Sequence, residues 1–259
     1  MKEEKKRLKI AWLFPDILYL HGERGNILAL ERLGAMMGLE TEVAKIDDGI
    51  QDFEPMDYHI IFCPPGEMVS MPGIIERLRP HREELENFID SGRVLLVTGT
   101  SQCIFGGRTE RSDGPDFDGL GIIDCDYRER KLVYGDDLCI TTDYCAGYDQ
   151  CFGVQIQMMD IASREKELGT IIYGFGNNEG SAEGIVKKNS IFTNLLGPAL
   201  VLNPWLTVEM IKRAAAAGNI EISETDIDMD LEMKSLEVKK AFALRRLWKA
   251  LAAGWLTSA

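Results

Sequence analysis

Strand-like and helix-like segments alternate through the first 105 residues, and this alternation constrains the fold more than any other feature of the sequence. Apolar runs at residues 8–14, 42–46, 58–63 and 93–97 have the length of strands. Residues 25–38 carry apolar side chains at helical spacing, and a second helix of about twenty residues is expected to end near Ser91. The pattern predicts a three-layer α/β fold, flavodoxin-like, in which a mainly parallel twisted sheet has helices on both faces.

This predicted sheet brings three loops to one edge. Parallel sheets of this kind bind ligands beyond the carboxyl ends of their strands. The loops that follow those ends are residues 15–24, 64–71 and 98–107. We therefore expect a functional site at this edge.

The rest of the chain has a different pattern. Short apolar runs separated by glycines fill residues 118–196 and predict a more antiparallel extension of the sheet, and residues 207–217 are expected to form a closing helix. Acidic residues are concentrated at 221–232 and basic residues at 234–249, as in a single helix with charges matched to its dipole. Apolar side chains follow this helix at helical spacing: Leu244, Leu247, Trp248, Leu251 and Trp255. We expect an α/β domain over residues 1–218 and a helical extension over 219–259, whose stripe packs on its own domain or, as the alternative, on a partner.

Charge and composition exclude several classes of function. The chain has 29 basic and 42 acidic residues and a formal charge of -13, so it would repel a nucleic-acid backbone. No apolar stretch approaches the roughly 20 residues that a membrane-spanning helix needs, and the short run before Pro15 has no signal-peptide cleavage site. These features predict a cytoplasmic protein that binds neither nucleic acid nor membrane.

The six cysteines include no Cys-x-x-Cys pair, so we expect reduced and mostly buried thiols. Cys139, Cys145 and Cys151 are six residues apart, which matches no common zinc pattern, and no histidine follows His81. The sequence predicts neither a metal site nor another cofactor.

The stretch VTGTSQCIFG, residues 97–106, reads like the turn from which many α/β enzymes present a nucleophile. Thr98 stands directly after the strand, but a threonine hydroxyl needs an activating base, and its β-branch disfavours the positive φ of such a turn. Cys103 and Ser101 are displaced into the following turn and helix. His21 is the only histidine on the expected edge, so a dyad of His21 with Thr98 or Ser101 stays open as an alternative. Gly66, in CPPGE, could offer a backbone N–H group to an oxyanion.

Six segments, taken in order, resemble one enzyme family: GNILAL, PPGE, VTGTSQCIFG, DGLGIID, YGFGNNEGSAEGI and NLLGPAL. They are similar to the CobB/CobQ-like class I glutamine amidotransferases, and in particular to the GatD-type glutaminase subunits of lipid II isoglutaminyl synthase. Those subunits supply ammonia to a Mur-ligase-like partner that amidates D-glutamate of the peptidoglycan precursor. The resemblance implies the class I amidotransferase fold, a peptidoglycan or cobalamin pathway, and a ligase or synthetase partner.

The resemblance also implies roles for individual positions. In the family, the residue after the strand is the catalytic cysteine, and a histidine precedes a late Gly-Pro; the matching positions here are Thr98 and Leu196. Gly66, Gly99 and Gln102 match the framework of the substrate pocket, and Arg130 or Lys131 lies near the basic residue that the family places against the substrate carboxylate.

Three hypotheses follow. The first is a subunit that has lost glutaminase activity and binds a ligase or synthetase, or forms a homo-oligomer, with a vestigial pocket for a small amino-acid-like ligand. The second is an active glutaminase or other hydrolase that uses Cys103, or Thr98 or Ser101 with His21. The third is a free-standing protein that binds an anionic metabolite.

Overall fold

A computed structural model describes residues 6–177, 180–223 and 227–252 of the chain. Its first sheet has the strand order β11-β12-β4-β3-β1-β2. All neighbouring strands in it are parallel except the edge pair β11 and β12. The strands are β1 (Arg7–Leu13), β2 (Glu40–Ile46), β3 (Ile60–Cys63), β4 (Val94–Thr98), β11 (Ile185–Lys187) and β12 (Ser190–Thr193). The predicted three-layer α/β fold with a mainly parallel sheet is confirmed.

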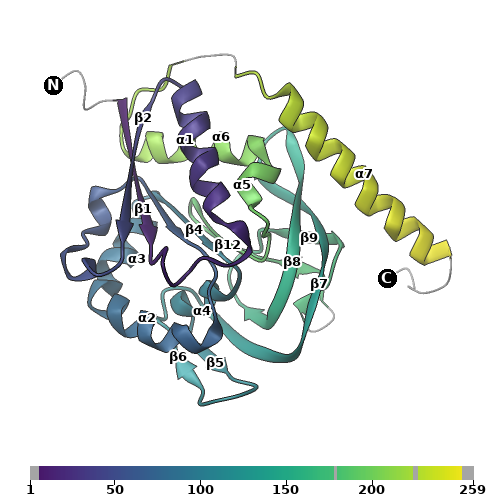
Figure 1. Cartoon of the computed structure of the whole chain (residues 1–259), viewed down its shortest axis with the longest axis horizontal. Coiled ribbons are helices and arrows are strands. Elements are labelled where there is room, and N and C mark those ends of the chain that lie inside the picture. The colour runs from purple at the N-terminus through teal and green to yellow at the C-terminus, as the bar shows by residue number, and fades with distance from the viewer. Residues whose placement is uncertain (1–5, 178–179, 224–226, 253–259) are drawn as a thin grey trace.

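Side-chain alternation along the strands builds one core on each face of this sheet. Ala11, Leu95 and Val97 join the core beneath one set of helices, and Ile10 and Leu96 join the core on the opposite face. The helices of the first face are α2 (Met71–Leu78), α3 (Arg82–Asp90) and α4 (Gln102–Phe105). Those of the second face are α1 (Arg24–Met36), α5 (Ala199–Leu202) and α6 (Pro204–Ala217), as Figure 1 shows.

Two segments differ from the sequence expectation. The single helix expected to end near Ser91 is divided into α2 and α3 by a 3-10 turn, Arg79–His81. Pro80 lies in this turn, and a proline removes a helical hydrogen bond and clashes with the preceding turn. The antiparallel region expected over residues 118–196 extends the first sheet only through β11 and β12, and its other strands form a second sheet.

The second sheet is built on a long antiparallel hairpin, β7 and β8. Its order is β10-β9-β7-β5-β6, with β8 paired to β7 outside that path. The strands are β5 (Arg108–Glu110), β6 (Phe117–Asp118), β7 (Cys125–Cys145), β8 (Tyr148–Ser163), β9 (Gly169–Tyr173) and β10 (Ala182–Glu183). A single bridge, Val154 to Leu196, connects β8 to the segment that follows β12.

The C-terminal helix α7 (Asp230–Ala252) lies along the rim of the molecule beside β7, β8 and β9 (Figure 1). Leu236 and Ala243 are buried against the domain, and Arg246 pairs with Asp136 of β7. Of the predicted apolar stripe, Trp248 is exposed and Trp255 lies outside the described residues. Within the described part of the chain, no helix combines the length and apolar character needed to cross a membrane.

Candidate functional site

The carboxyl ends of β1, β3, β4 and β12 meet at one edge of the first sheet, where the sequence places Thr98. Thr98 is the last residue of β4, is fully buried, and has extended backbone angles (φ −119°, ψ 143°). The positive φ expected of the turn falls instead on Gly99, at +59°. Thr98 is therefore unstrained, because a β-branched residue fits an extended strand end.

Gly99 is required at this turn for two reasons. Its φ lies in the left-handed region, and a Cβ there would stand 2.9 Å from Cβ of Pro65. We expect Gly99→Ala to lower the free energy of unfolding by about 2 kcal/mol. Gly49→Ala is the control, because Gly49 has φ −83° and open space around it, and it should change stability by less than about 0.5 kcal/mol. Urea unfolding of both variants measures the difference; an equal effect of the two would contradict this account of Gly99.

The buried carboxylate of Glu23 accepts a hydrogen bond from the Thr98 hydroxyl. Thr98 donates a hydrogen bond to Oε2 of Glu23 over 3.0 Å, and Asn26 Nδ2 donates to the same oxygen over 2.7 Å. The backbone N–H of Gly197 donates to Oε1 over 2.9 Å. Glu23 is fully buried just before α1, so it joins β4 to the turn that follows Leu196.

Burial also changes the protonation of Glu23. It raises the pKa of this carboxyl from 4.5 to about 7, against the opposing effect of the hydrogen bonds from Gly197, Thr98 and Asn26. A carboxyl with such a pKa could act as a base near neutral pH. In this structure, however, neither Glu23 nor Thr98 has any exposed surface.

Leu196 is a buried apolar side chain next to Gly99, the residue that follows Thr98. It is buried, its Cδ2 lies 3.3 Å from the position that a Cβ on Gly99 would take, and its backbone exchanges two hydrogen bonds of 2.9 Å with Val154. A leucine has no group that could accept a proton. Leu196 therefore closes the edge and ties the two sheets together.

In the Pro-Pro-Gly turn after β3, the backbone N–H of Gly66 already donates a hydrogen bond within the protein. The Gly66 N–H donates to Oγ1 of Thr100 over 3.1 Å, and the Thr100 hydroxyl donates back to the Gly66 carbonyl over 2.6 Å. Leu18 of the loop after β1 covers this turn, because its Cδ2 would lie 2.5 Å from a Cβ on Gly66. Because Gly66 has no side chain, Leu18 can pack closely against its backbone. In this arrangement the Gly66 N–H is bonded to Thr100 and is not available to an oxyanion.

Gln102 and its neighbours form a second polar cluster at the same edge. The buried Gln102 amide donates to the Gly99 carbonyl over 3.1 Å and to Asn194 Oδ1 over 3.2 Å. Glu183, also buried, accepts hydrogen bonds from the Thr193 hydroxyl and the Asn194 backbone. Thr193 is the register partner of Thr98, so each of two adjacent strands ends in a threonine bonded to a buried glutamate.

The other proposed nucleophiles and the histidine are separated from one another. The Ser101 hydroxyl donates to the Pro64 carbonyl over 2.6 Å. Cys103 is fully buried in α4, and burial raises the pKa of its thiol. His21 has a left-handed backbone (φ 62°), and burial lowers its pKa. Among the described residues, no hydrogen bond joins His21 to Thr98 or Ser101, whose hydroxyls are both taken elsewhere.

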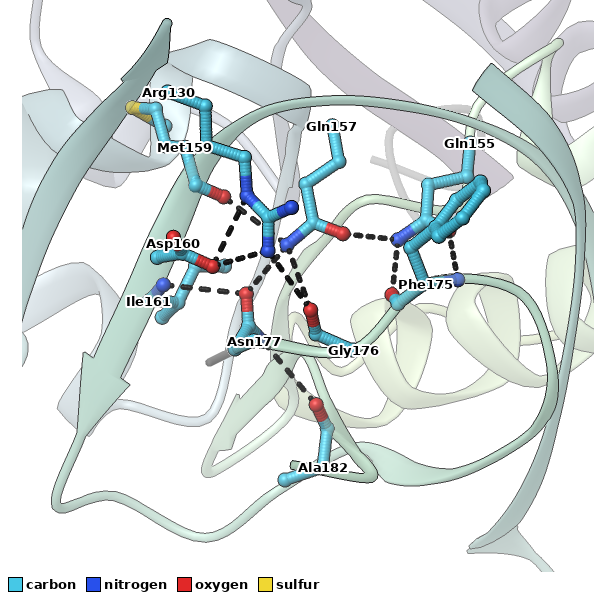
Figure 2. A network of polar contacts seen from close by, with 10 residues as sticks. All are labelled: Arg130, Gln155, Gln157, Met159, Asp160, Ile161, Phe175, Gly176, Asn177 and Ala182. Carbon is cyan, nitrogen blue, oxygen red and sulfur yellow. Dashed lines mark hydrogen bonds and ion pairs between the residues drawn. The ribbon is translucent and has the colours of Figure 1, made fainter. Parts of the chain in front are cut away.

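Arg130 lies in the second sheet, where its charge is already compensated. Its guanidinium pairs with Asp160 and donates to the Gly176 carbonyl over 3.0 Å (Figure 2). The guanidinium also stacks over the Tyr134 ring, whose centroid is 4.9 Å away. Lys131, the next residue, is exposed. A ligand carboxylate that approached Arg130 would have to compete with Asp160.

The network around Arg130 continues through two buried glutamines of β8, as Figure 2 shows. Gln155 exchanges hydrogen bonds with the backbone of Phe175 and donates to Gln157. Gln157 in turn donates to Oδ1 of Asn177 over 2.8 Å. These contacts fix the loop after β9 on the long hairpin.

Comparison with known proteins finds relatives of one kind, glutamine amidotransferase subunits. No protein-family model matches the chain. It is 26% identical over 238 residues to subunit GatD of the glutamine-hydrolysing lipid II isoglutaminyl synthase of Staphylococcus aureus strain N315, covering 89% of this chain and 94% of the relative. Subunit GatD of the same enzyme from Streptococcus pneumoniae strain R6 is 26% identical over 215 residues, or 80% of each chain. A crystal structure of a glutamine amidotransferase shares the fold, with a TM-score of 0.50 at 16% identity over 79% of this chain and 98% of that one.

The chain is similar to GatD-type glutamine amidotransferase subunits over most of its length. The resemblance inferred from the six sequence segments is therefore confirmed at the level of the family.

Glu23 is the residue of this GatD-like chain that sequence reasoning missed. It lies in HGERGNIL, within the loop expected at the functional edge, but a charged residue before a helix is usually exposed. Its placement at the edge was therefore predictable, whereas its burial was not. The partners that bury it, Thr98 and Gly197, are 75 and 174 residues away in the chain.

The ion pair of Arg130 offers a test of the second sheet. Arg130→Met removes the ion pair with Asp160 at a site where both side chains are only 15% exposed, so we expect a loss of about 2 kcal/mol in the free energy of unfolding. Arg128→Met is the control in the same strand, because Arg128 and its partner Glu110 are 67% and 50% exposed; its cost should stay below about 0.5 kcal/mol. Guanidinium unfolding compares the two, and a negligible cost for Arg130→Met would contradict a stabilising role.

Proposed function

We propose that this chain is a glutamine amidotransferase-like subunit that no longer hydrolyses glutamine and that binds a ligase or synthetase partner. A single observation carries the first part: the hydroxyl at the nucleophile position, on Thr98, is buried and donates to the equally buried Glu23. Glutamine hydrolysis through a covalent intermediate needs an exposed nucleophile, a base to take its proton, and N–H donors for the oxyanion.

For each of these three requirements, the structure has a feature that works against it. Thr98 is sealed from solvent, Leu196 occupies the position that corresponds to the family's histidine, and the Gly66 N–H is bonded to Thr100. The changes support loss of activity because they affect separate steps of the same reaction.

The partner is inferred from the relatives. Both GatD proteins are subunits of a lipid II isoglutaminyl synthase. We infer that this chain, with residues 1–218 as its amidotransferase-like domain and 219–259 as a helical extension, serves as a binding or regulatory subunit of a Mur-ligase-like enzyme. On this proposal the partner takes its nitrogen from free ammonia, since the chain supplies none.

The test is to co-express the chain with the Mur-ligase-like protein of the same organism and to purify the complex. Amidation by the complex should proceed with an ammonium salt and should not proceed with glutamine. A GatD relative with its own ligase is the positive control, because it should use glutamine. Glutamine-dependent amidation by the complex, or failure of the two proteins to co-purify, would count against the proposal.

The alternative is an active enzyme with an unusual nucleophile such as Cys103. It is disfavoured by the burial of Cys103 and by the raised pKa of its thiol, because the thiolate is the reactive form. A thiol-directed glutamine analogue separates the two readings by mass spectrometry of the intact protein. We expect no covalent adduct on the folded chain, whereas stoichiometric labelling of Cys103 would favour the alternative.

A further inference from the structure

The segment between β1 and α1 contains a strap, residues 15–20, with a left-handed backbone position at each end. Phe14, directly before the strap, has φ +48°, and His21, directly after it, has φ +62°. Residues other than glycine rarely adopt such angles, and a bulky aromatic residue does so only under constraint. Gly22 follows with φ +73°, which a glycine adopts without strain. The strap is therefore strained at both ends, and the chain next to its second end turns easily.

The middle of the strap covers the Pro-Pro-Gly turn after β3. Leu18 is fully buried, and its Cδ2 would lie 2.5 Å from a Cβ on Gly66. The Ile17 carbonyl oxygen would lie 3.3 Å from the same Cβ. Side chain and backbone of the strap thus fill the space that the glycine leaves free. The family resemblance implies that Gly66 belongs to the substrate pocket, so the chain closes that part of the pocket with a side chain of its own.

The strap is held over this turn by one main-chain hydrogen bond and by the burial of a leucine. The Leu20 N–H donates to the Pro65 carbonyl over 3.2 Å. The N–H groups of Ile17 and Leu18 donate instead to the Phe14 carbonyl, at the start of the strap itself. The burial of one leucine side chain and the strain of two left-handed residues are free energies of similar size and opposite sign. We therefore expect the closed position to be only slightly favoured.

We propose that the strap opens and closes the pocket over Gly66 while the rest of the domain stays folded. It pivots at Phe14 and at His21, and in the closed position it inserts Leu18. Opening relaxes the backbone of His21, and the exposed Leu18 side chain drives the strap closed again. A ligand at this pocket has to displace Leu18, so the strap is an autoinhibitory contact.

The opening leaves the neighbouring pair of Glu23 and Thr98 in place. Glu23 lies beyond the second pivot, and its carboxyl accepts hydrogen bonds from the Thr98 hydroxyl and the Gly197 N–H. The Glu23 N–H also points to the Leu20 carbonyl of the strap, but at 3.5 Å this contact is weak. The inference thus goes beyond the proposed function and does not depend on it, because the strap moves whether or not the chain hydrolyses glutamine.

Thiol labelling of the full chain measures the opening. A Leu18→Cys variant carries a reporter in the strap, whereas the native Cys63 of β3 and Cys103 of α4 are fully buried and report unfolding of the domain in the same molecule. Iodoacetamide should label position 18 at least about a hundredfold faster than either native thiol, because local opening needs less free energy than global unfolding. Mass spectrometry of the peptides gives the three rates, and equal rates would overturn the proposal.

Hydrogen exchange of the wild type tests the same opening without a substitution. The Leu20 N–H donates to Pro65 and has to lose this bond when the strap opens, whereas the Phe14 N–H donates to the Ile46 carbonyl on the other side of the first pivot. Relative to an unfolded peptide, the Leu20 N–H should exchange at least about a hundredfold faster than the Phe14 N–H. Equal protection of the two groups would overturn the proposal, even if the Leu18→Cys variant is labelled quickly.

Alanine and glycine variants test the second pivot. His21→Ala and His21→Gly remove the same imidazole, but only glycine fits the left-handed backbone of the closed strap without strain. In the Leu18→Cys background, labelling of position 18 should therefore be about fivefold faster with His21→Ala than with His21→Gly. Tyr19 is the control position, because it has φ −137° and is 63% exposed; there the glycine variant should be labelled at least as fast as the alanine variant. Labelling that is no faster with His21→Ala than with His21→Gly would overturn the proposal.

Discussion

Replacing Glu23 by alanine is expected to lower the free energy of unfolding by about 3 kcal/mol at pH 5, where the carboxyl is protonated in the folded chain. The substitution leaves the Thr98 hydroxyl, the Asn26 amide and the Gly197 N–H without their acceptor, and these groups are buried or partly buried. It also opens a cavity where the side chain stood. Guanidinium unfolding followed by circular dichroism measures the loss.

Two further variants serve as a control and as a milder test of the role of Glu23. Glu67→Ala changes an exposed glutamate of the loop after β3, so it should cost less than about 0.5 kcal/mol. Thr98→Val removes only the hydroxyl and should cost about 1 kcal/mol, and it remains informative if Glu23→Ala does not fold. Equal stability of Glu23→Ala and Glu67→Ala would show that the carboxylate does not hold this edge together.

The second large effect is a pH dependence that comes from Glu23. Its pKa is raised from 4.5 to about 7 in the folded chain, so the unfolded chain loses this proton at a lower pH than the folded chain does. The stability associated with the protonated form is therefore complete below about pH 4.5 and is lost as the pH rises towards 7. The full change corresponds to about 3 kcal/mol.

The experiment compares the wild type with Glu23→Gln, which has the same shape and does not titrate. Unfolding free energies are measured from pH 4.5 to 8, and the wild type is expected to lose about 3 kcal/mol relative to the variant as the pH rises. Other carboxyls, including the buried Glu183, are present in both proteins and cancel in the difference. A difference that stays constant with pH would contradict the raised pKa of Glu23.

The first sheet could be predicted from the sequence because its central strands are buried on both faces and appear as uninterrupted apolar runs. Val94 to Val97 is such a run, and it places Thr98 at the functional edge without further information. The second sheet was harder to predict. Its strands β7 and β8 are long and partly exposed, so their residues give no simple alternation, and the short apolar runs of residues 118–196 predict strands shorter than these two.

The contacts that close the site could not be predicted. The hydrogen bonds of Glu23 to Thr98 and of Thr100 to Gly66 join residues that are far apart in the chain, and their existence depends on the final positions of three loops. Local sequence predicts which residues reach the edge, but not which polar groups satisfy each other there. The turn at Gly99 is a similar case, because only the folded backbone shows that the positive φ falls after Thr98.

The central claim is that the edge carrying Thr98 and Glu23 is closed to glutamine. Ammonia release from glutamine by the purified chain, alone and with its ligase partner, tests this claim most directly. The account predicts a rate equal to that of buffer. Ammonia release that a single substitution at Thr98, Glu23 or Cys103 abolishes would contradict it.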